Sequence, residues 1–307
     1  MIGTIVRAAA ILRSGGLVAF PTETVYGLGA DATNADAVRK VFAVKGRPST
    51  NPLICHVPDA DVAQRYAREW PPGAAQLAAA FWPGPLTLVL SKTDDIPHDV
   101  TAGRDTVALR APNHALTLML LRILDRPLAG PSANESSHVS PTTAQHVRDE
   151  LGDKVDMILD GGPCDVGIES TVLDLTGSHP TVLRPGGVRR EQIEALIGPV
   201  DVFAGAVAPA VAAASPGQHE KHYAPRTPAY RFESADRARV NGAILELSDD
   251  AAVYARRFYA RLRELDESGV SAIYIEMPPD APEWTAVRDR ILRATQPLPL
   301  QMTPLPP

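Results

Sequence analysis

Two cations separated by a single glycine form the first stretch of this sequence that could do chemistry. In KGRPSTNPLICH, Lys45 and Arg47 stand on either side of Gly46, so a flexible backbone can turn both cations toward one anion. Pro48 and Pro52 remove two backbone donors and stiffen the exit, which favours a shaped binding loop. Since a lone KGR is more often a solvated basic turn, the rest of the chain has to decide between the two interpretations.

Two further polar stretches follow short apolar segments, as ligand-binding loops at strand ends do. PTETVYGLGADA begins at Pro21 and offers the polar side chains of Thr22, Glu23 and Thr24 beside two glycines. Its GLGADA lacks the third glycine of a dinucleotide-binding fingerprint, so a plain glycine turn remains an alternative. PSANESSHVSPT could donate hydroxyl and amide groups to a phosphate or ribose, or could simply be a polar loop that caps the next helix.

Histidine and cysteine form no metal-binding or disulfide pattern. His56 stands among apolar residues, where a histidine is more often part of the core than a ligand. Cys55 and Cys164 lie far apart and form no CxxC pair, which argues against a disulfide scaffold and a zinc site. His219 and His222 are three apart, but two histidines without a third ligand are a weak metal signal. We therefore expect reduced thiols and no metal held by protein ligands alone.

Composition indicates a globular chain of about two domains, since 307 residues exceed the usual size of one. No apolar run approaches the ~20 residues that a membrane span requires. The N-terminal run carries Arg7 and Arg13 inside its apolar pattern, so we expect an amphipathic helix, no signal peptide and a cytoplasmic location. The net charge of -6 disfavours coating of nucleic acid through bulk electrostatics but allows a local basic pocket.

Helical and strand-like segments alternate along the chain and would position these loops. Periodicity predicts strands at 17–20, 53–57, 86–90, 106–110, 127–130, 157–160, 170–175 and 181–184. It predicts helices at 35–44, 73–81, 116–124, 143–151 and 190–197. A stretch rich in alanine, proline and glycine follows, and is typical of a linker. Beyond it, strands at 242–247 and 270–276 and helices at 251–267 and 284–294 precede a proline-rich tail that we expect to be mobile.

Eight strings, taken in order, resemble the YrdC-like domain of threonylcarbamoyl-AMP synthases, in the long form with an extra C-terminal domain. They are PTETVYGLGADA, KGRPSTNPLICHV, FWPGPLTLVL, TVALRAP, PSAN, GIESTVLD, LRPG and SPGQHEKHYAP. Eight strings in family order are highly specific, and they reverse the simpler interpretations given above. The resemblance implies an α/β protein with a mixed twisted sheet of the α+β type and flanking helices at 1–198. A linker at 199–228 and a smaller Rossmann-like α/β domain at 229–307 would follow.

The family reaction, carried over by resemblance, joins L-threonine, bicarbonate and ATP into threonylcarbamoyl-adenylate and releases pyrophosphate. Such a nucleotidyltransferase supplies the modification of an adenosine beside the tRNA anticodon through partner proteins, so tRNA would be an indirect partner and a membrane none. No nucleophilic side chain is needed, because the protein has to hold two anionic substrates together and neutralise phosphate charge. Mg2+ is expected on the phosphates of ATP, without a dedicated protein cage.

By similarity, the candidate site residues fall into two sets. The threonine pocket would comprise Thr24, His56, Arg110 and Ser170, with Arg110 on the amino-acid carboxylate. The ATP set would comprise Lys45, Arg47, Asn51, Thr106, Ser132, Asn134, Ser140, Arg184 and Tyr223, with Lys45 and Arg47 as candidate catalytic residues. Tyr223 resembles the linker tyrosine that folds over the nucleotide, which would make the linker a lid as well as a tether.

Two departures from the family pattern stand out. After PSAN the family usually has a serine-glycine turn, whereas this chain has ESS at 135–137, which leaves the path to Ser140 open. In the linker, QHE at 218–220 replaces a common methionine and Lys-Tyr pair, which alters the local charge beside Tyr223.

Two other functions compete with the synthase. An RNA-binding module could grip structured RNA through the same basic concavity, although the acidic balance of the chain disfavours it. Carbamoyl transfer in hydrogenase maturation also uses YrdC-like domains, but the zinc-finger cysteines expected alongside them are absent from this sequence. The C-terminal domain has no identifiable chemistry, so positioning the linker and binding a partner both stay open.

Overall fold

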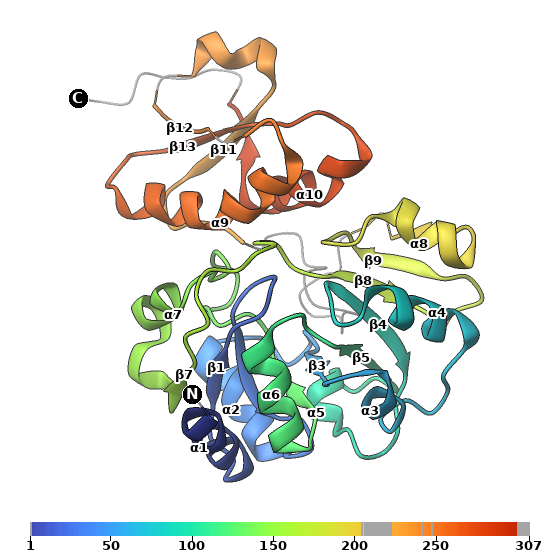
Figure 1. Cartoon of the computed structure of the whole chain (residues 1–307). Helices are drawn as coiled ribbons and strands as arrows, with labels where there is room; N and C mark the ends of the chain where they lie inside the picture. Colours follow the sequence, from blue (N-terminus) through green and yellow to red (C-terminus); the bar gives the residue numbers. More distant parts are fainter. Residues whose placement is uncertain (1, 204, 206–222, 241, 247, 300–307) are drawn as a thin grey trace.

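Two β-sheets organise the chain, one in each half of the molecule (Figure 1). The computed structural model describes residues 2–203, 205, 223–240, 242–246 and 248–299. Positions 218–220, His219 and His222 lie outside these ranges, and so does most of the predicted linker. Among the described residues, no helix has both the length and the apolar character needed to cross a membrane.

The first sheet is mixed, and its ten strands run in the order β10-β9-β8-β4-β5-β3-β6-β2-β1-β7. Its strands are β1 (Val18–Phe20), β2 (Gly27–Asp31), β3 (Ile54–His56), β4 (Leu86–Ser91), β5 (Thr106–Arg110), β6 (Leu128–Ala129), β7 (Met157–Ile158), β8 (Thr171–Asp174), β9 (Thr181–Arg184) and β10 (Asp201–Val202). β3 is parallel to β5 and β4 to β8, whereas β4 and β5 are antiparallel. This confirms the predicted mixed sheet.

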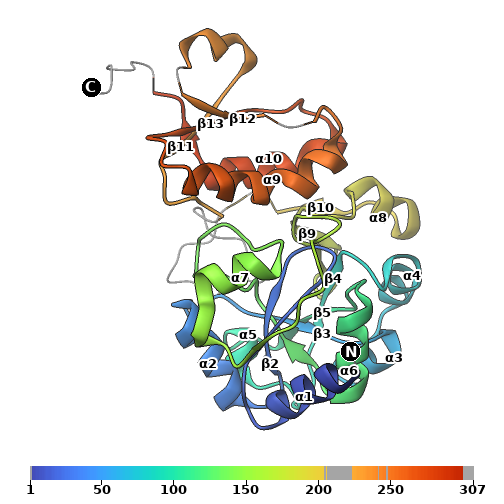
Figure 2. The ribbon, with the colours of Figure 1, turned by 60° about the vertical axis from the view of Figure 1, so that its left-hand side comes forward.

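Helices flank this sheet (Figure 2), and the residues that they bury are mostly apolar. They are α1 (Ile2–Arg13), α2 (Ala35–Lys45), α3 (Ala60–Gln64), α4 (Pro72–Phe81), α5 (His98–Thr101), α6 (Ala115–Leu124), α7 (Ala144–Leu151) and α8 (Arg190–Ile197). In α2, the Asn34 side chain caps the N-terminus and Gly46, at a φ of 59°, ends the helix. Lys45 is therefore the last helical residue, and the chain turns sharply just before Arg47.

The second sheet has four strands in the order β12-β13-β11-β14, all of them parallel. This confirms the predicted smaller α/β unit. The strands are β11 (Ala229–Phe232), β12 (Ala243–Leu245), β13 (Ile273–Glu276) and β14 (Gln296–Pro297). Helices α9 (Ala251–Glu267) and α10 (Thr285–Ala294) lie between this sheet and the first half of the chain (Figures 1 and 2). Short 3-10 turns stand at Gly152–Lys154, Ser234–Arg239 and Pro282–Trp284.

Most predicted elements appear within a few residues of their predicted bounds, but several predictions were wrong. GLGAD was predicted as part of a loop and forms strand β2, which is fully buried between β1 and β6. A Cβ at Gly27 would approach the Phe20 ring to 2.5 Å, so glycine is needed there for packing against the neighbouring strand. The predicted linker supplies edge strand β10, and the predicted mobile tail begins with β14. Strand β11 and helices α3 and α5 had no strong periodic signal.

The two halves share one apolar cluster. Val25, Val139 and Ile168 from loops of the first half pack in the same buried cluster as Phe258 and Leu262 of α9. Because the apolar stripe of α9 faces these loops, burial of apolar surface holds the second half against the loops that follow the strands of the first.

Candidate active site

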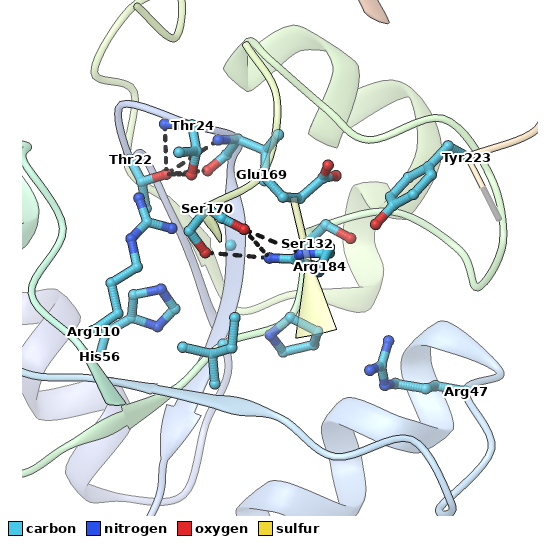
Figure 3. A pocket seen from close by; sticks show the side chains of 15 residues that line it. Thr22, Thr24, Arg47, His56, Arg110, Ser132, Glu169, Ser170, Arg184 and Tyr223 are labelled. Carbon is cyan, nitrogen blue, oxygen red and sulfur yellow. Dashed lines mark hydrogen bonds between the residues drawn. The ribbon is translucent and has the colours of Figure 1, made fainter. Parts of the chain in front are cut away.

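A pocket lies at one end of the first sheet, where β5 ends, β8 begins and β9 ends (Figure 3). Because β4 runs antiparallel to β5 and parallel to β8, the last residue of β5 lies beside the start of β8. In this mixed sheet, the last residues of some strands and the first residues of others therefore lie on the same side. Eight predicted site residues line the pocket, namely Thr24, Arg47, His56, Arg110, Ser132, Ser170, Arg184 and Tyr223.

Arg110, the last residue of β5, is buried and already has one ion pair. Its Nη2 lies 2.7 Å from Oε2 of Glu23, and its Nε donates to the Gly84 carbonyl oxygen at 3.2 Å. The other Glu23 oxygen, Oε1, has no hydrogen-bond partner within the described part of the chain. Since a guanidinium has five N–H donors, Arg110 retains donors for a carboxylate ligand.

His56 ends β3 and is neutral. Its ring lies edge-on to Phe20, with 5.2 Å between the centroids, and its Nδ1 is 3.3 Å from the carbonyl oxygen of Leu128. Burial and the charge of Arg110 lower the pKa of His56 to about 3. Because a carbonyl can only accept, Nδ1 carries the proton and Nε2 is left as an acceptor. A Cβ at Gly130 would lie 3.2 Å from His56 Nδ1 and 2.7 Å from Phe20, which requires glycine there.

A local turn sets Thr24. The Thr22 hydroxyl donates to the Val25 carbonyl at 2.6 Å and accepts from the backbone N–H of Thr24 and Val25 at 3.1 Å. The Thr24 hydroxyl lies 2.8 Å from that of Thr22. These bonds fix the Thr24 side chain at the wall of the pocket.

Ser170 and Arg184 join the two predicted substrate sets. Arg184 donates to the Ser170 carbonyl from Nε at 3.1 Å and from Nη2 at 2.9 Å, and its Nη2 lies 3.2 Å from the Ser170 hydroxyl. That hydroxyl is also 2.8 Å from the hydroxyl of Thr87 on β4. The residue predicted for threonine and the residue predicted for ATP are therefore hydrogen-bonded neighbours.

Arg47 makes the pocket strongly receptive to an anion. It donates to the carbonyl oxygens of Asn51 at 3.1 Å and Pro52 at 2.9 Å, and no described carboxylate pairs with it. Burial and the nearby charge of Arg184 lower the pKa of Arg47 to about 9. With Arg110, three arginines line the pocket against one glutamate. Phosphate or carboxylate groups would relieve this buried positive charge.

That glutamate, Glu169, was not predicted as a site residue. Its Oε1 accepts from Ser140 at 2.7 Å, and its Oε2 accepts from Arg290 Nε at 2.8 Å and from the Tyr259 hydroxyl at 2.9 Å. Burial alone would raise its pKa, but the charges of Arg290 and Arg184 outweigh burial and lower the pKa of Glu169 to about 2. The GIES string contains this residue, but its partners on α9 and α10 could not be foreseen from spacing.

Tyr223 enters the pocket beside the second half of the chain. It is 1% exposed and has a φ of 63°. The next residue, Ala224, donates its N–H to the Ser137 carbonyl at 2.9 Å. Ser137 belongs to the ESS departure and has a φ of 68°, which glycine adopts with less strain. The chain nevertheless continues to a fully buried Ser140, which settles the path through this loop.

Five predicted residues do not line the pocket, namely Lys45, Asn51, Thr106, Asn134 and Ser140. The Lys45 ammonium donates to the carbonyl oxygen of Ser132 at 2.6 Å and to that of Asn134. Burial lowers the pKa of Lys45 well below its usual range, and the charge of Arg47 adds to this. Thr106 begins β5, at the strand end opposite Arg110. Lys45 therefore supports the loop that carries Ser132, and Thr106 lies away from the pocket.

Among the described residues, the side chains that line this pocket form no metal-binding cluster, and the cavity between them is small. The cluster of described side chains that could hold a metal, Glu135, His138 and Glu150, does not line it. Lys154 already pairs with Glu135, and Arg263 with Glu150. The cavity volume is about 40 Å3, which is room for about three water molecules.

Known proteins share both halves of the chain. Residues 10–186 match a family model described as telomere recombination, and residues 188–296 match that of the threonylcarbamoyl-AMP synthase C-terminal domain. The threonylcarbamoyl-AMP synthase of Pyrococcus abyssi is 40% identical in an alignment 315 positions long, which covers 94% of this chain and 93% of that protein. That of Bacillus subtilis is 40% identical in an alignment 319 positions long, which covers 94% of this chain and 92% of that protein. The crystal structure of P. abyssi Sua5 complexed with L-threonine has a TM-score of 0.88 at 37% identity, over 96% of each chain.

Proposed function

The chain belongs to the threonylcarbamoyl-AMP synthase family, and we propose that its pocket joins L-threonine, bicarbonate and ATP into threonylcarbamoyl-adenylate and pyrophosphate. The observation that carries this proposal is the direct hydrogen bonding of Ser170 to Arg184. In Figure 3, His56 and Arg110 lie on one side of these two residues, and Arg47 and Tyr223 on the other. An amino acid on the first side would meet a phosphate held on the second.

The threonine side would bind the amino acid through three groups. Arg110 would take the carboxylate, because it retains donors beyond its bonds to Glu23 and Gly84. His56 Nε2 would accept a hydrogen bond from the substrate hydroxyl, and Ser170 and Thr24 would bound the side chain. A site that binds a hydroxyl with a buried acceptor rejects analogues that lack the hydroxyl.

The nucleotide side would neutralise phosphate charge. Arg47 and Arg184 would contact the phosphates, Ser132 would offer its hydroxyl, and the Tyr223 ring would cover the nucleotide. Lys45 would act through the loop that holds Ser132. Bicarbonate takes up a proton and releases water to give carbon dioxide, and the threonine amine adds to this carbon dioxide and loses a proton to give a carbamate. A carbamate oxygen then forms a bond to the α-phosphorus as the bond from that phosphorus to pyrophosphate breaks. Positioning and charge neutralisation would supply the acceleration, since no side-chain nucleophile is required.

Mg2+ would enter with ATP. Glu169 is the carboxylate among the described lining residues, and both of its oxygens accept hydrogen bonds from protein donors. The metal would therefore be held chiefly by phosphate oxygens and water, as Mg2+ commonly is.

The wider role would be to supply the adenylate for threonylcarbamoyladenosine in tRNA, through partner proteins and in the cytoplasm. Residues 1–198 would form the catalytic domain, 199–228 the linker and 229–307 the second domain.

A pyrophosphate-release assay tests the proposal. The purified chain should release pyrophosphate only when ATP, L-threonine and bicarbonate are all present, and mass spectrometry should detect threonylcarbamoyl-adenylate. Arg184→Met should abolish most of this activity, whereas Thr106→Val, a change outside the pocket, should retain it. No pyrophosphate under complete conditions would refute the synthase. Tight RNA binding without ATP or threonine would instead favour an RNA-binding module.

A further inference from the structure

A carboxylate beside a phosphate-binding site weakens phosphate binding, because it competes for the cations that would bind the phosphate. Glu169 stands in this place, next to Ser170 and close enough to Arg184 for the Arg184 charge to lower the pKa of Glu169. Figure 3 shows its carboxylate turned toward Tyr223 and away from Arg110. What holds it in that direction decides how much positive charge the pocket offers.

Two residues of the second half of the chain hold the Glu169 carboxylate. Arg290 of α10 is 0% exposed and donates from Nε to Glu169 Oε2 at 2.8 Å, and the Tyr259 hydroxyl of α9 binds the same oxygen at 2.9 Å. Arg290 also donates from Nη2 to the Pro185 carbonyl at 3.0 Å, and its guanidinium lies 5.1 Å from the centre of the Tyr223 ring. One guanidinium thus touches the acidic residue, the strand-end loop and the aromatic wall.

We propose that Arg290 is a positioning residue for the adenylation reaction, which holds Glu169 so that this carboxylate does not compete with the substrate phosphates for Arg184. This rests on the function proposed above, and it gives the C-terminal domain a defined task in the chemistry. Arg290 is not among the residues that line the pocket. It acts through Glu169 and through the face of the Tyr223 ring.

The charges explain why loss of Arg290 should weaken the binding of ATP. Without Arg290, the described hydrogen-bond partners left to Glu169 are the hydroxyls of Ser140 and Tyr259, and Arg184 is the remaining cation whose charge lowers the pKa of Glu169. A carboxylate on Arg184 would repel the phosphates and occupy their donors. Neutral Gln at position 169 would not compete in this way, so the damage should depend on the Glu169 charge.

The interface offers a matched control. Arg256 of α9 pairs with Asp165 across the same two halves of the chain, but both side chains are exposed and neither lines the pocket. Arg256→Ala removes an interdomain ion pair without touching Glu169. It therefore measures what weakened domain contact alone does to the kinetics.

Steady-state kinetics on the full chain test the proposal. Arg290→Met should raise the KM for ATP by about 10- to 100-fold, the effect of losing one hydrogen bond to a charged group. Arg256→Ala should leave the KM for ATP within about twofold, since an exposed ion pair contributes little. Adding Glu169→Gln to Arg290→Met should return the KM for ATP most of the way to that of the unchanged chain. Circular dichroism and melting confirm that each variant is folded.

Each outcome decides. If Glu169→Gln fails to recover the Arg290→Met variant, or if Arg256→Ala is equally damaged, Arg290 is only a structural residue. Should Arg290→Met not fold, comparison of Glu169→Gln with Glu169→Gln/Arg290→Met replaces it. If these two variants have an equal KM for ATP, the proposal is supported. If the KM for ATP is about tenfold higher in the double variant, the effect of one lost hydrogen bond to a charged group, the proposal is overturned. A wild-type chain without threonine-dependent pyrophosphate release would refute the proposed function instead.

Discussion

Replacement of Arg110 by methionine separates substrate binding from fold stability in one experiment. Arg110 is 3% exposed and its partner Glu23 is 5% exposed, so both charges are buried. Arg110→Met keeps most of the side-chain volume but leaves the Glu23 carboxylate without its cation. The same change removes the group proposed to bind the threonine carboxylate.

The structure sets the size of both effects. Breaking a buried ion pair from one side costs about 3–5 kcal/mol. In a folding unit of about 150–250 residues, such as the first half of the chain, that lowers the Tm by roughly 6–20 °C. The KM for L-threonine should rise by about 10- to 100-fold through the lost hydrogen bonds to its carboxylate. The KM for ATP should stay within about twofold, because Arg47 and Arg184 remain in place.

A double variant distinguishes the two effects. Glu23→Gln/Arg110→Met removes both charges, so it should recover much of the Tm but none of the threonine affinity. Differential scanning calorimetry and pyrophosphate release at varied threonine measure the two quantities. Recovery of threonine binding in the double variant, or an equal rise of the KM for ATP in Arg110→Met, would show that Arg110 is only a structural partner of Glu23.

Three further predictions concern other buried groups. Lys45→Met should lower the kcat of adenylate formation by about tenfold and leave the KM for threonine unchanged, because Lys45 supports the Ser132 loop. Steady-state kinetics measure both quantities, and an altered KM for threonine would contradict this role. The pKa of His56 is about 3 in the folded chain and about 6.5 in the unfolded chain. Between these two values the unfolded chain binds a proton at His56 and the folded chain does not. Stability is therefore lost as the pH falls from 6.5, by about 2 kcal/mol at pH 5. His56→Gln should reduce the Tm difference between pH 7 and pH 5, and an unchanged difference would refute the assignment. Burial raises the pKa of Cys55 to about 12 and also raises that of Cys164, so iodoacetamide should label neither thiol in the native chain, and rapid labelling would show that a thiol is accessible.

The local chemistry of the sequence was enough to predict much of the pocket. The pattern TVALR predicted a buried strand with a cation at its end. The strand is β5, and its last residue, Arg110, lines the pocket. KGR follows α2 because Gly46 adopts the left-handed conformation that ends the helix. These features depend on residues close in sequence.

Features that depend on distant residues were missed. Strand β2 is rich in glycine because it packs against the Phe20 ring, and such packing has no periodic signal. Thr106 shares its string with Arg110, but the length of a strand separates the two residues, so similarity alone put both in the pocket. Glu169 depends on Arg290, which is 121 positions away in the chain and lies on helix α10 of the other half. Spacing along the sequence carries no information about that contact.

A crystal structure with L-threonine and a nonhydrolysable ATP analogue tests the central claim most directly. The account predicts the threonine carboxylate within hydrogen-bond distance of Arg110, and the α-phosphate beside Arg184. The threonine amino group should then face that phosphate across Ser170. Threonine and nucleotide bound at separate places, or a nucleotide away from Arg184 and Arg47, would contradict a single pocket for both substrates.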